Sequence, residues 1–325
     1  MSASTCLAVM YHYVRNSETM PFSAIRALPP ALFERQLDWL QSRCRLIGFD
    51  QLAEALSGRA SLPSDAALLT FDDGFVDHYA TVLPILRQRG LSGVFFLAHD
   101  TYGPAPRVLG VHKTHFLLAR LGPDALAKAV LQECELVLAT EDARSGRVFG
   151  ADRWERADER AVKELLNYQL PFDEADRVLD ILFARHIGSQ EAFARELYLN
   201  DGMIAEMVSA GMTFGFHTRS HRMLSRLTRR DQEVELSDGV SWIRTMTGQM
   251  QVPFCYPWGG PKTYTRETLA LLEQTGYSMA FNTVRRRIDL AQDGRFELPR
   301  VDTRDLPPYT TGEPSAALRG PAQEA

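Results

Sequence analysis

The 325-residue sequence lacks the features that mark several large classes of protein. No apolar run approaches the ~20 residues that a membrane-spanning helix needs. The first residues contain neither a basic segment nor a long apolar one, so they do not indicate a secretory signal peptide. A formal net charge of −5 provides no basic footprint for nucleic acid or for an anionic membrane surface. We therefore expect a cytoplasmic protein that neither spans a membrane nor binds nucleic acid.

Cysteine is also scarce. The chain has four cysteines, widely spaced and without a Cys-x-x-Cys pair: Cys6, Cys44, Cys134 and Cys255. This spacing suggests neither a thiolate zinc site nor a disulfide framework. Hydrophobic residues make up 45% of the chain and charged residues 24%, which is ordinary for a globular protein with one large domain or two modest ones.

Short apolar stretches alternate with helix-like segments through most of the chain. Strands are predicted at residues 5–10, 66–71, 93–97, 212–216, 252–256, 278–282 and 296–301. Helices are predicted between them at residues 30–43, 51–56, 76–89, 202–210, 228–246 and 266–274. Strand–helix–strand alternation at this spacing predicts an α/β fold with parallel strand pairing.

The alternation is interrupted once. Residues 102–200 show helical periodicity, Gly-Pro breaks and charged runs but no clear strand signal, so we expect a helical insertion that would suit a lid. The α/β domain would then comprise residues 1–101 and 201–303. Residues 304–325 contain several prolines among small residues, which predicts a poorly ordered tail.

Two adjacent carboxylates follow the strand predicted at residues 66–71. Asp72 and Asp73 end this strand, and Gly74 permits a sharp change of chain direction. The carboxyl end of a buried strand is where α/β enzymes place their chemistry. By itself, however, Asp-Asp-Gly is equally well explained as a turn in which one Asp caps the next helix. Other motifs of the chain are needed to distinguish a catalytic pair from such a turn.

A pair of histidines follows another predicted strand. His217 and His221 come directly after residues 212–216, and their spacing of four places both imidazoles on one face of a helical turn. Two His and one carboxylate are three protein ligands, which leaves open positions for water and substrate, as a catalytic zinc site requires. The two motifs together, each after a buried strand, are a much stronger signal than either alone.

At this point the chain resembles a known family. Residues 70–74 (TFDDG) and 217–221 (HTRSH) are similar to the first two motifs of the polysaccharide deacetylases, carbohydrate esterase family 4 or NodB homology domain. The resemblance covers roughly residues 5–100 and 200–303. It implies a deformed (β/α) barrel and a divalent metal, commonly zinc, used to hydrolyse N-acetyl groups of amino sugars. It also implies that Asp72 is the general base and that Asp73, His217 and His221 are the metal ligands.

The remaining family motifs match less directly. Residues 254–259 (FCYPWG) resemble the third motif, which makes Trp258 the candidate backbone N–H donor to the oxyanion and Tyr256 a candidate substrate contact. The Arg that usually opens this motif is absent, and so is the late Leu-x-x-His that supplies the general acid, since none of the eight His follows His221. Rearranged relatives take that His from an N-terminal Tyr-His. By this resemblance His12 is the general acid, and Arg300 returns the missing Arg.

One further pair lies at the start of the predicted insertion. His112 and His115 are three apart on a predicted helix, where contact with substrate is favoured over a second metal site. The preferred hypothesis is a metal-dependent hydrolase that removes an N-acyl group from an amino sugar, free, nucleotide-linked or lipid-linked. The alternatives are a related amidase or deformylase on a non-sugar amide, and a catalytically weak carbohydrate-binding relative.

Overall fold

The structure, a computed structural model, describes residues 5–19, 21–134 and 157–310. The part of the expected insertion at 135–156 and the part of the expected tail at 311–325 lie outside the described residues. The chain divides into two compact units. Unit 1 comprises residues 1–16, 27–99 and 198–325, and unit 2 comprises residues 17–26 and 100–197.

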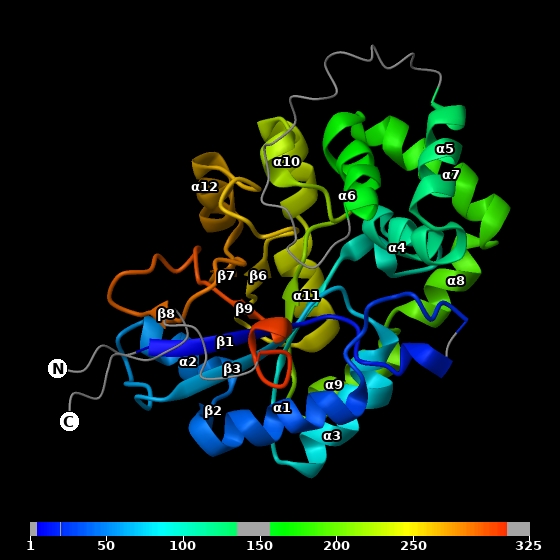
Figure 1. Cartoon of the computed structure of the whole chain (residues 1–325). Helices are drawn as coiled ribbons and strands as arrows, with labels where there is room; N and C mark the ends of the chain where they lie inside the picture. The colour runs from blue at the N-terminus through cyan, green and yellow to red at the C-terminus, as the bar shows by residue number, and fades with distance from the viewer. Residues whose placement is uncertain (1–4, 20, 135–156, 311–325) are drawn as a thin grey trace. The chain divides into compact units, whose positions relative to one another are not determined.

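Unit 1 is built around a mostly parallel sheet. Its strands are β1 (Thr5–Tyr11), β2 (Arg45–Leu46), β3 (Ala66–Phe71), β4 (Val94–Leu97), β5 (Thr213–Phe216), β6 (Phe254–Cys255), β7 (Ala280–Phe281), β8 (Ile288–Asp289) and β9 (Val301–Asp302). The order along the sheet is β7-β6-β5-β4-β3-β1-β8, with β2 also paired to β3 and β9 to β1. Among these pairs only β1–β8 is antiparallel. Figure 1 shows β1 and β3, which pair in register from Cys6–Ala66 to Tyr11–Phe71, lying side by side.

The sheet curls back on itself through the segment before β9. Leu298 makes a parallel bridge to Phe281 of β7, and Val301 pairs with Val9 of β1. One short segment therefore joins β7, at one end of the sheet, to β1, which lies next to the other end. The predicted deformed (β/α) barrel is confirmed by this curled parallel sheet, and its strands are uneven in length.

Helices follow the strands of unit 1 as the alternation predicted. They are α1 (Pro30–Arg43), α2 (Phe49–Leu56), α3 (Leu83–Gln88), α9 (Asp201–Ser209), α10 (Arg229–Leu236), α11 (Gly239–Thr247) and α12 (Arg266–Thr275), with short turns η2 (His78–Val82), η6 (Leu224–Arg226) and η7 (Thr303–Asp305). The short η3 (His99–Thr101) lies where unit 1 passes into unit 2.

Two of the expected helices differ from the structure. The helix predicted at 228–246 is divided into α10 and α11, and a Cβ on Gly239 would lie 2.2 Å from the Tyr277 hydroxyl oxygen. Glycine is therefore needed at this junction for close packing. The helix predicted at 76–89 begins with the π-helical turn η2, and Pro84 stands in the first turn of α3 that follows.

The interior of the barrel is filled by alternate residues of its strands. One buried cluster contains residues from six strands together with residues of the α2 region: Cys6, Ala8, Ile47, Phe49, Leu52, Ala53, Leu62, Ala66, Leu68, Val94, Phe96, Cys255, Met279, Phe281, Ile288 and Leu298. Alternation along each strand sends every second side chain inward. The same alternation then carries Thr70 and Asp72 to the inner side of the sheet edge.

Unit 2 is helical in its described part. Its elements are η1 (Ser17–Thr19), α4 (Gly110–Leu121), α5 (Pro123–Glu133), α6 (Ala157–Glu164), η5 (Leu165–Gln169), α7 (Phe172–His186) and α8 (Gln190–Leu197). These helices enclose a buried cluster of their own, which runs from Leu117 to Leu182. Within the described residues, no helix of either unit has the length and apolar character needed to cross a membrane.

Candidate active site

The sequence-predicted residues of unit 1 gather at one edge of the sheet. Asp72 follows β3, His217 follows β5, and His12 follows β1. These strands run parallel to one another through β4. Because the carboxyl ends of parallel strands meet at one edge, side chains far apart in sequence converge there.

The backbone at this edge is strained. Four non-glycine residues of the described chain have positive φ angles: Asp73 (75°), Thr218 (64°), His221 (62°) and Trp258 (66°). Non-glycine residues in the left-handed region are uncommon, and such strain clusters at functional sites. All four belong to the three motifs that the sequence analysis singled out, so the strain and the motifs mark the same place.

Asp73, His217 and His221 form a compact set of candidate metal ligands, referred to below as the ligand set. Asp73 Oδ1 lies 3.5 Å from His217 Nε2 and 3.6 Å from His221 Nε2. The Asp73 and His217 side chains are almost completely buried. The His217 Nδ1–H donates to the Cys255 carbonyl at 2.8 Å, which leaves the Nε2 lone pair facing Asp73. Such a second hydrogen bond orients a metal-binding imidazole and fixes its tautomer.

The chemistry of this donor set fits a divalent metal such as zinc. One carboxylate oxygen and two imidazole nitrogens lie within 4.8 Å of one another. Burial lowers the pKa of His217 and outweighs the opposing effect of Asp72 and Asp73, so the imidazole is neutral, the form that binds metal. Three protein ligands would leave positions open, as in catalytic zinc sites.

Asp72 does not join this set because Arg300 holds it. Arg300 Nη1 donates to Asp72 Oδ1 at 2.7 Å, and Nη2 donates to Oδ2 at 2.8 Å. Its other hydrogen bonds go to the Asn282 carbonyl, the Thr70 hydroxyl and the Cys255 sulfur. All five N–H donors of this buried guanidinium are therefore used, which fixes the carboxylate in a bidentate pair.

The charge state of Asp72 follows from two opposing effects. Burial by itself raises the pKa of this carboxyl, but the Arg300 guanidinium opposes it by charge and by hydrogen bonding, and the net pKa is lowered. Asp72 is therefore ionised at neutral pH. An ionised carboxylate beside the ligand set is able to accept a proton.

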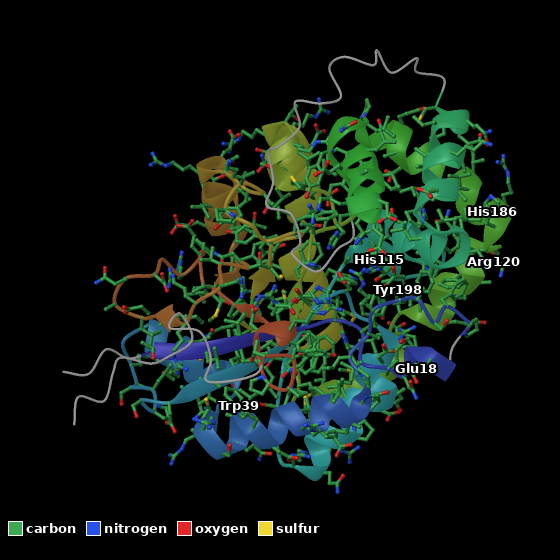
Figure 2. The ribbon with its side chains drawn as sticks, in the orientation of Figure 1. Glu18, Trp39, His115, Arg120, His186 and Tyr198 are labelled. Carbon is green, nitrogen blue, oxygen red and sulfur yellow. The ribbon has the colours of Figure 1, made fainter. Side chains whose placement is uncertain are left out.

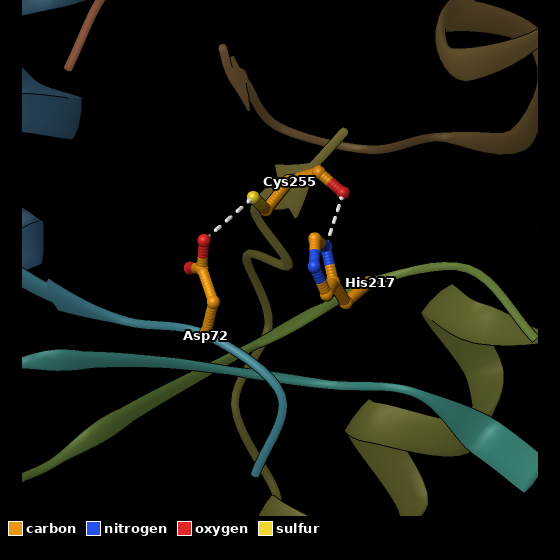
Figure 3. A group of neighbouring side chains, drawn as sticks. All are labelled: Asp72, His217 and Cys255. Atoms are coloured by element: carbon orange, nitrogen blue, oxygen red, sulfur yellow. Dashed lines mark hydrogen bonds between the residues drawn. The ribbon is translucent and has the colours of Figure 1, made fainter. Parts of the chain in front are cut away.

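A second group of candidate ligands is less suited to a metal. Asp72, His217 and Cys255 also bring their ligand atoms together, and Figure 3 shows the thiol contacting Asp72 Oδ2, at 3.6 Å. Burial raises the pKa of the Cys255 thiol well above its usual range. With Arg300 Nη2 2.9 Å from the sulfur, a cation already lies against this group. The set that contains Asp73 is therefore better suited to a metal than this second group.

His12 faces the carboxylate from the end of β1. Its Nε2 lies 3.8 Å from Asp72 Oδ2, and its side chain is 39% exposed. This imidazole is thus both open to solvent and close to Asp72, which suits a group that exchanges protons with a substrate.

The residues of the third motif have different surroundings. The Trp258 ring lies 5.8 Å from the His221 ring, centroid to centroid, so Trp258 is next to the ligand set. Tyr256 is 1% exposed, its hydroxyl donates to the Phe296 carbonyl, and its ring stacks on Tyr264. This packing argues against the substrate contact expected of Tyr256, and it remains outside the site that we propose.

The His pair of the insertion lies in the other unit. His112 and His115 are on α4, where Figure 2 labels His115, and their ring centroids are 6.0 Å apart. His112 is almost fully buried within unit 2. Substrate contact by this pair stays a prediction from the sequence.

Two residues near the site were not assigned a role from the sequence. Cys255 lies inside the FCYPWG motif, yet only the structure shows that it contacts Asp72, Arg300 and His217. Glu235 of α10 accepts hydrogen bonds from the Ser220 N–H at 2.9 Å and from the Ser220 hydroxyl. It thereby holds the loop between the two histidines. A buried Glu in a charged helix carries no local signal that distinguishes it from its exposed neighbours.

Comparisons with known proteins agree with this geometry. The family model described as polysaccharide deacetylase matches residues 173–280. The protein YxkH of Bacillus subtilis (strain 168), whose name assigns it to the polysaccharide deacetylases, is 20% identical over 276 residues. That alignment covers 85% of this chain and 63% of YxkH, so the chain spans less than two thirds of this relative.

Solved structures show the same fold at low sequence identity. Deacetylase PplD of Streptococcus pyogenes, solved with acetate, has a TM-score of 0.56 at 17% identity, and 93% of each chain is covered. IcaB from Ammonifex degensii has a TM-score of 0.54 at 18% identity, again over 93% of each chain. A de-N-acetylase from Aggregatibacter actinomycetemcomitans has a TM-score of 0.56 at 14% identity, over 92% of this chain and 95% of that one. By its family-model match, its curated relative and its fold, this chain is similar to the polysaccharide deacetylases.

Proposed function

We propose that this protein is a metal-dependent hydrolase that removes an N-acetyl group from an amino sugar. The observation that carries the proposal is the convergence of Asp73, His217 and His221 beside a carboxylate, Asp72, that is held in a bidentate pair and kept out of the ligand set. This separates three metal ligands from one proton acceptor at a single strand edge. A carbohydrate-binding relative without activity would have no need of that separation.

The residues have distinct parts in the reaction. A divalent metal held by the three ligands would supply Lewis acidity toward the amide carbonyl and make water more acidic. Asp72 takes a proton from the attacking water at its carboxylate. His12 delivers a proton to the departing amine, which is a poor leaving group until protonated. The backbone N–H of Trp258 is the candidate donor to the negative oxygen that develops on the carbonyl.

The first test separates the base from the ligands. Asp72→Asn should retain about one equivalent of metal, as in catalytic zinc sites. It should lose deacetylation by roughly 10²- to 10⁴-fold, as expected for a general base. Asp73→Asn should instead weaken metal binding, because a ligand is lost. Elemental analysis after dialysis and acetate release from N-acetylated amino sugars, free and nucleotide-linked, provide the two measurements.

The outcomes distinguish the candidate functions. Metal loss in Asp72→Asn with retention in Asp73→Asn would exchange the two roles. Acetate or formate release from simple amides but from none of the sugars would favour the non-sugar amidase. A parent protein that binds sugar but releases no acetate would be the carbohydrate-binding relative.

A further inference from the structure

The chain that carries His12 is tied to the first turn after the Asp pair. The His78 ring, at the start of η2, lies 3.0 Å from the His12 carbonyl oxygen through its Nε2. A carbonyl oxygen can only accept a hydrogen bond, so Nε2 carries the proton. The bond fixes the main chain at the residue that presents the proposed general acid.

Asp77 adds two bonds to the same segment. Its Oδ2 accepts from the Val14 N–H at 3.1 Å and from Arg15 Nε at 2.6 Å. Asp77 is almost fully buried, so these bonds are shielded from water. Asp77 and His78, which are adjacent in one helical turn, therefore hold His12, Val14 and Arg15 in the segment after β1.

Packing alone does not account for a histidine at position 78. Its ring is completely buried against the rings of Phe71, Phe75 and Phe95, a site where an aromatic hydrocarbon would pack well. Burial lowers the pKa of His78 to about 4, and its Nδ1 has no hydrogen-bond partner among the described residues. Burying a polar ring nitrogen without a partner is unfavourable. What a histidine provides here that a hydrocarbon ring could not is the hydrogen bond from its Nε2 to the His12 carbonyl.

The three hydrogen bonds that join His78 and Asp77 to the segment after β1, which we call the tether, determine how far His12 lies from Asp72. Asp72 is fixed by Arg300, while His12 is half-exposed and lies 3.8 Å from Asp72. Within the described residues no hydrogen bond holds the His12 ring itself, so the position of the ring depends on the backbone of His12. Small misplacements of a catalytic group are costly in rate.

We propose that His78 and Asp77 are positioning residues that hold His12 opposite Asp72, and so couple the loop that carries the general acid to the strand that carries the base. The inference rests on the proposed function for its catalytic meaning. The presence of the tether does not depend on activity and can be tested without measuring turnover.

The catalytic test uses the metal-loaded enzyme and two substrates. His78→Phe keeps an aromatic ring but removes the donor, and His78→Gln keeps an N–H donor of similar reach. We expect His78→Phe to lower kcat on an N-acetylated amino sugar by about 10- to 100-fold. The rate on a nitrophenyl acetate ester, whose leaving group needs no proton, should change less than about twofold, and His78→Gln should recover most of the loss. Asp77→Ala should resemble His78→Phe.

Val82→Ala provides the matched control, because Val82 is fully buried in the same turn η2 but makes no bond to the His12 segment. It should lower both rates equally or not at all. If His78→Phe and Val82→Ala give the same pattern, or if His78→Phe loses both substrates equally, the tether has only a structural role and the proposal fails.

A second readout separates the tether from the proposed function. In protein labelled with ¹⁵N-histidine, the His12 imidazole signal of the parent should respond to Asp72→Asn. In His78→Phe that response should disappear, because the ring no longer stays beside Asp72. A parent without turnover on any N-acetyl sugar but with this coupling would overturn the proposed function and retain the tether. A response that is unchanged in His78→Phe would overturn the tether, whatever the activity.

Discussion

At the scale of single residues, Asp72 and Arg300 form a buried ion pair at the centre of the candidate site. Both side chains are almost fully removed from solvent, and their two hydrogen bonds are 2.7 and 2.8 Å long. Removing one partner of such a pair leaves an uncompensated buried charge, whereas removing both does not. The stability of the fold and the ionisation of the proposed base therefore depend on the same contact.

This pair predicts a non-additive effect on stability. Arg300→Met should lower the free energy of unfolding by roughly 3–5 kcal/mol, because Asp72 is left buried without its cation. Adding Asp72→Asn to Arg300→Met should recover part of this loss. Arg300→Lys keeps a charge but cannot form the bidentate pair, so it should fall between Arg300→Met and the parent. Urea unfolding of the variants measures the coupling, and simple additivity of the two changes would contradict it.

His12 gives the second prediction at this scale. His12→Ala should keep the metal and the fold, since the side chain is partly exposed, but lose amide turnover by roughly 10²- to 10⁴-fold. An activated acetate ester should be hydrolysed nearly as fast as by the parent, because its leaving group needs no proton. Metal analysis and steady-state rates on the two substrates make the comparison. Equal loss on both would assign His12 to binding or structure, and an unimpaired variant would move the search to His112 and His115.

At the scale of elements, the turn η2 contains a buried titratable group, His78, whose effect on the free energy of unfolding depends on pH. Burial lowers the pKa of His78 from its ordinary 6.5 to about 4. Between these values the unfolded chain binds a proton that the folded protein does not. Above about pH 6.5 the titration of His78 therefore does not affect the free energy of unfolding. As the pH falls from 6.5 toward 4, this free energy decreases, because the proton binds only to the unfolded chain.

A variant isolates this effect. His78→Gln keeps a hydrogen-bond donor but cannot titrate, so it should lose less stability than the parent between pH 7 and pH 5. The difference should be roughly 2 kcal/mol. Urea unfolding of the metal-free parent and variant at both pH values gives the measurement, and the comparison cancels the other histidines. Equal losses would show that His78 titrates normally in the folded protein.

At the scale of the whole molecule, each of the two units has a buried hydrophobic cluster of its own. The sheet of unit 1 passes from β4 to β5 as direct neighbours, although residues 100–197 intervene in sequence. The helices of unit 2 pack around a cluster that contains no residue of unit 1. The strand edge that carries Asp73, His217 and His221 therefore belongs to unit 1.

This organisation predicts the result of removing the inserted helices. With residues 100–197 replaced by a short linker, and with Phe22, which packs on Phe116, changed to Ser, unit 1 should still fold and bind about one equivalent of metal. If the insertion acts as the lid that its sequence suggests, turnover of small N-acetyl sugars should fall. Circular dichroism, metal analysis and acetate release test the three statements separately. A shortened chain that does not fold would show that the insertion belongs to the core of the protein.

The sequence by itself determined the alternation of strands and helices and the motifs that follow the ends of the strands. The alternation of apolar stretches and helices predicted parallel strand pairing, and the family resemblance implied the deformed barrel; the structure confirms both. TFDDG and HTRSH predicted the places where Asp73, His217 and His221 come together. Missing residues were informative as well, since the absent Arg and late His directed attention to Arg300 and His12.

Only the tertiary structure decided which residues, distant in sequence, hold Asp72 and His12 in place. The bonds from His78 to His12 and from Asp77 to Val14 join residues more than sixty positions apart, and the contact of Arg300 with Asp72 spans more than two hundred. Such contacts depend on strand order and register, which arise from the packing of the whole sheet and leave no periodic signal in any one segment. The same reason explains the two-residue strand β8, whose antiparallel pairing with β1 depends on its place at the sheet edge and is too short to show a pattern.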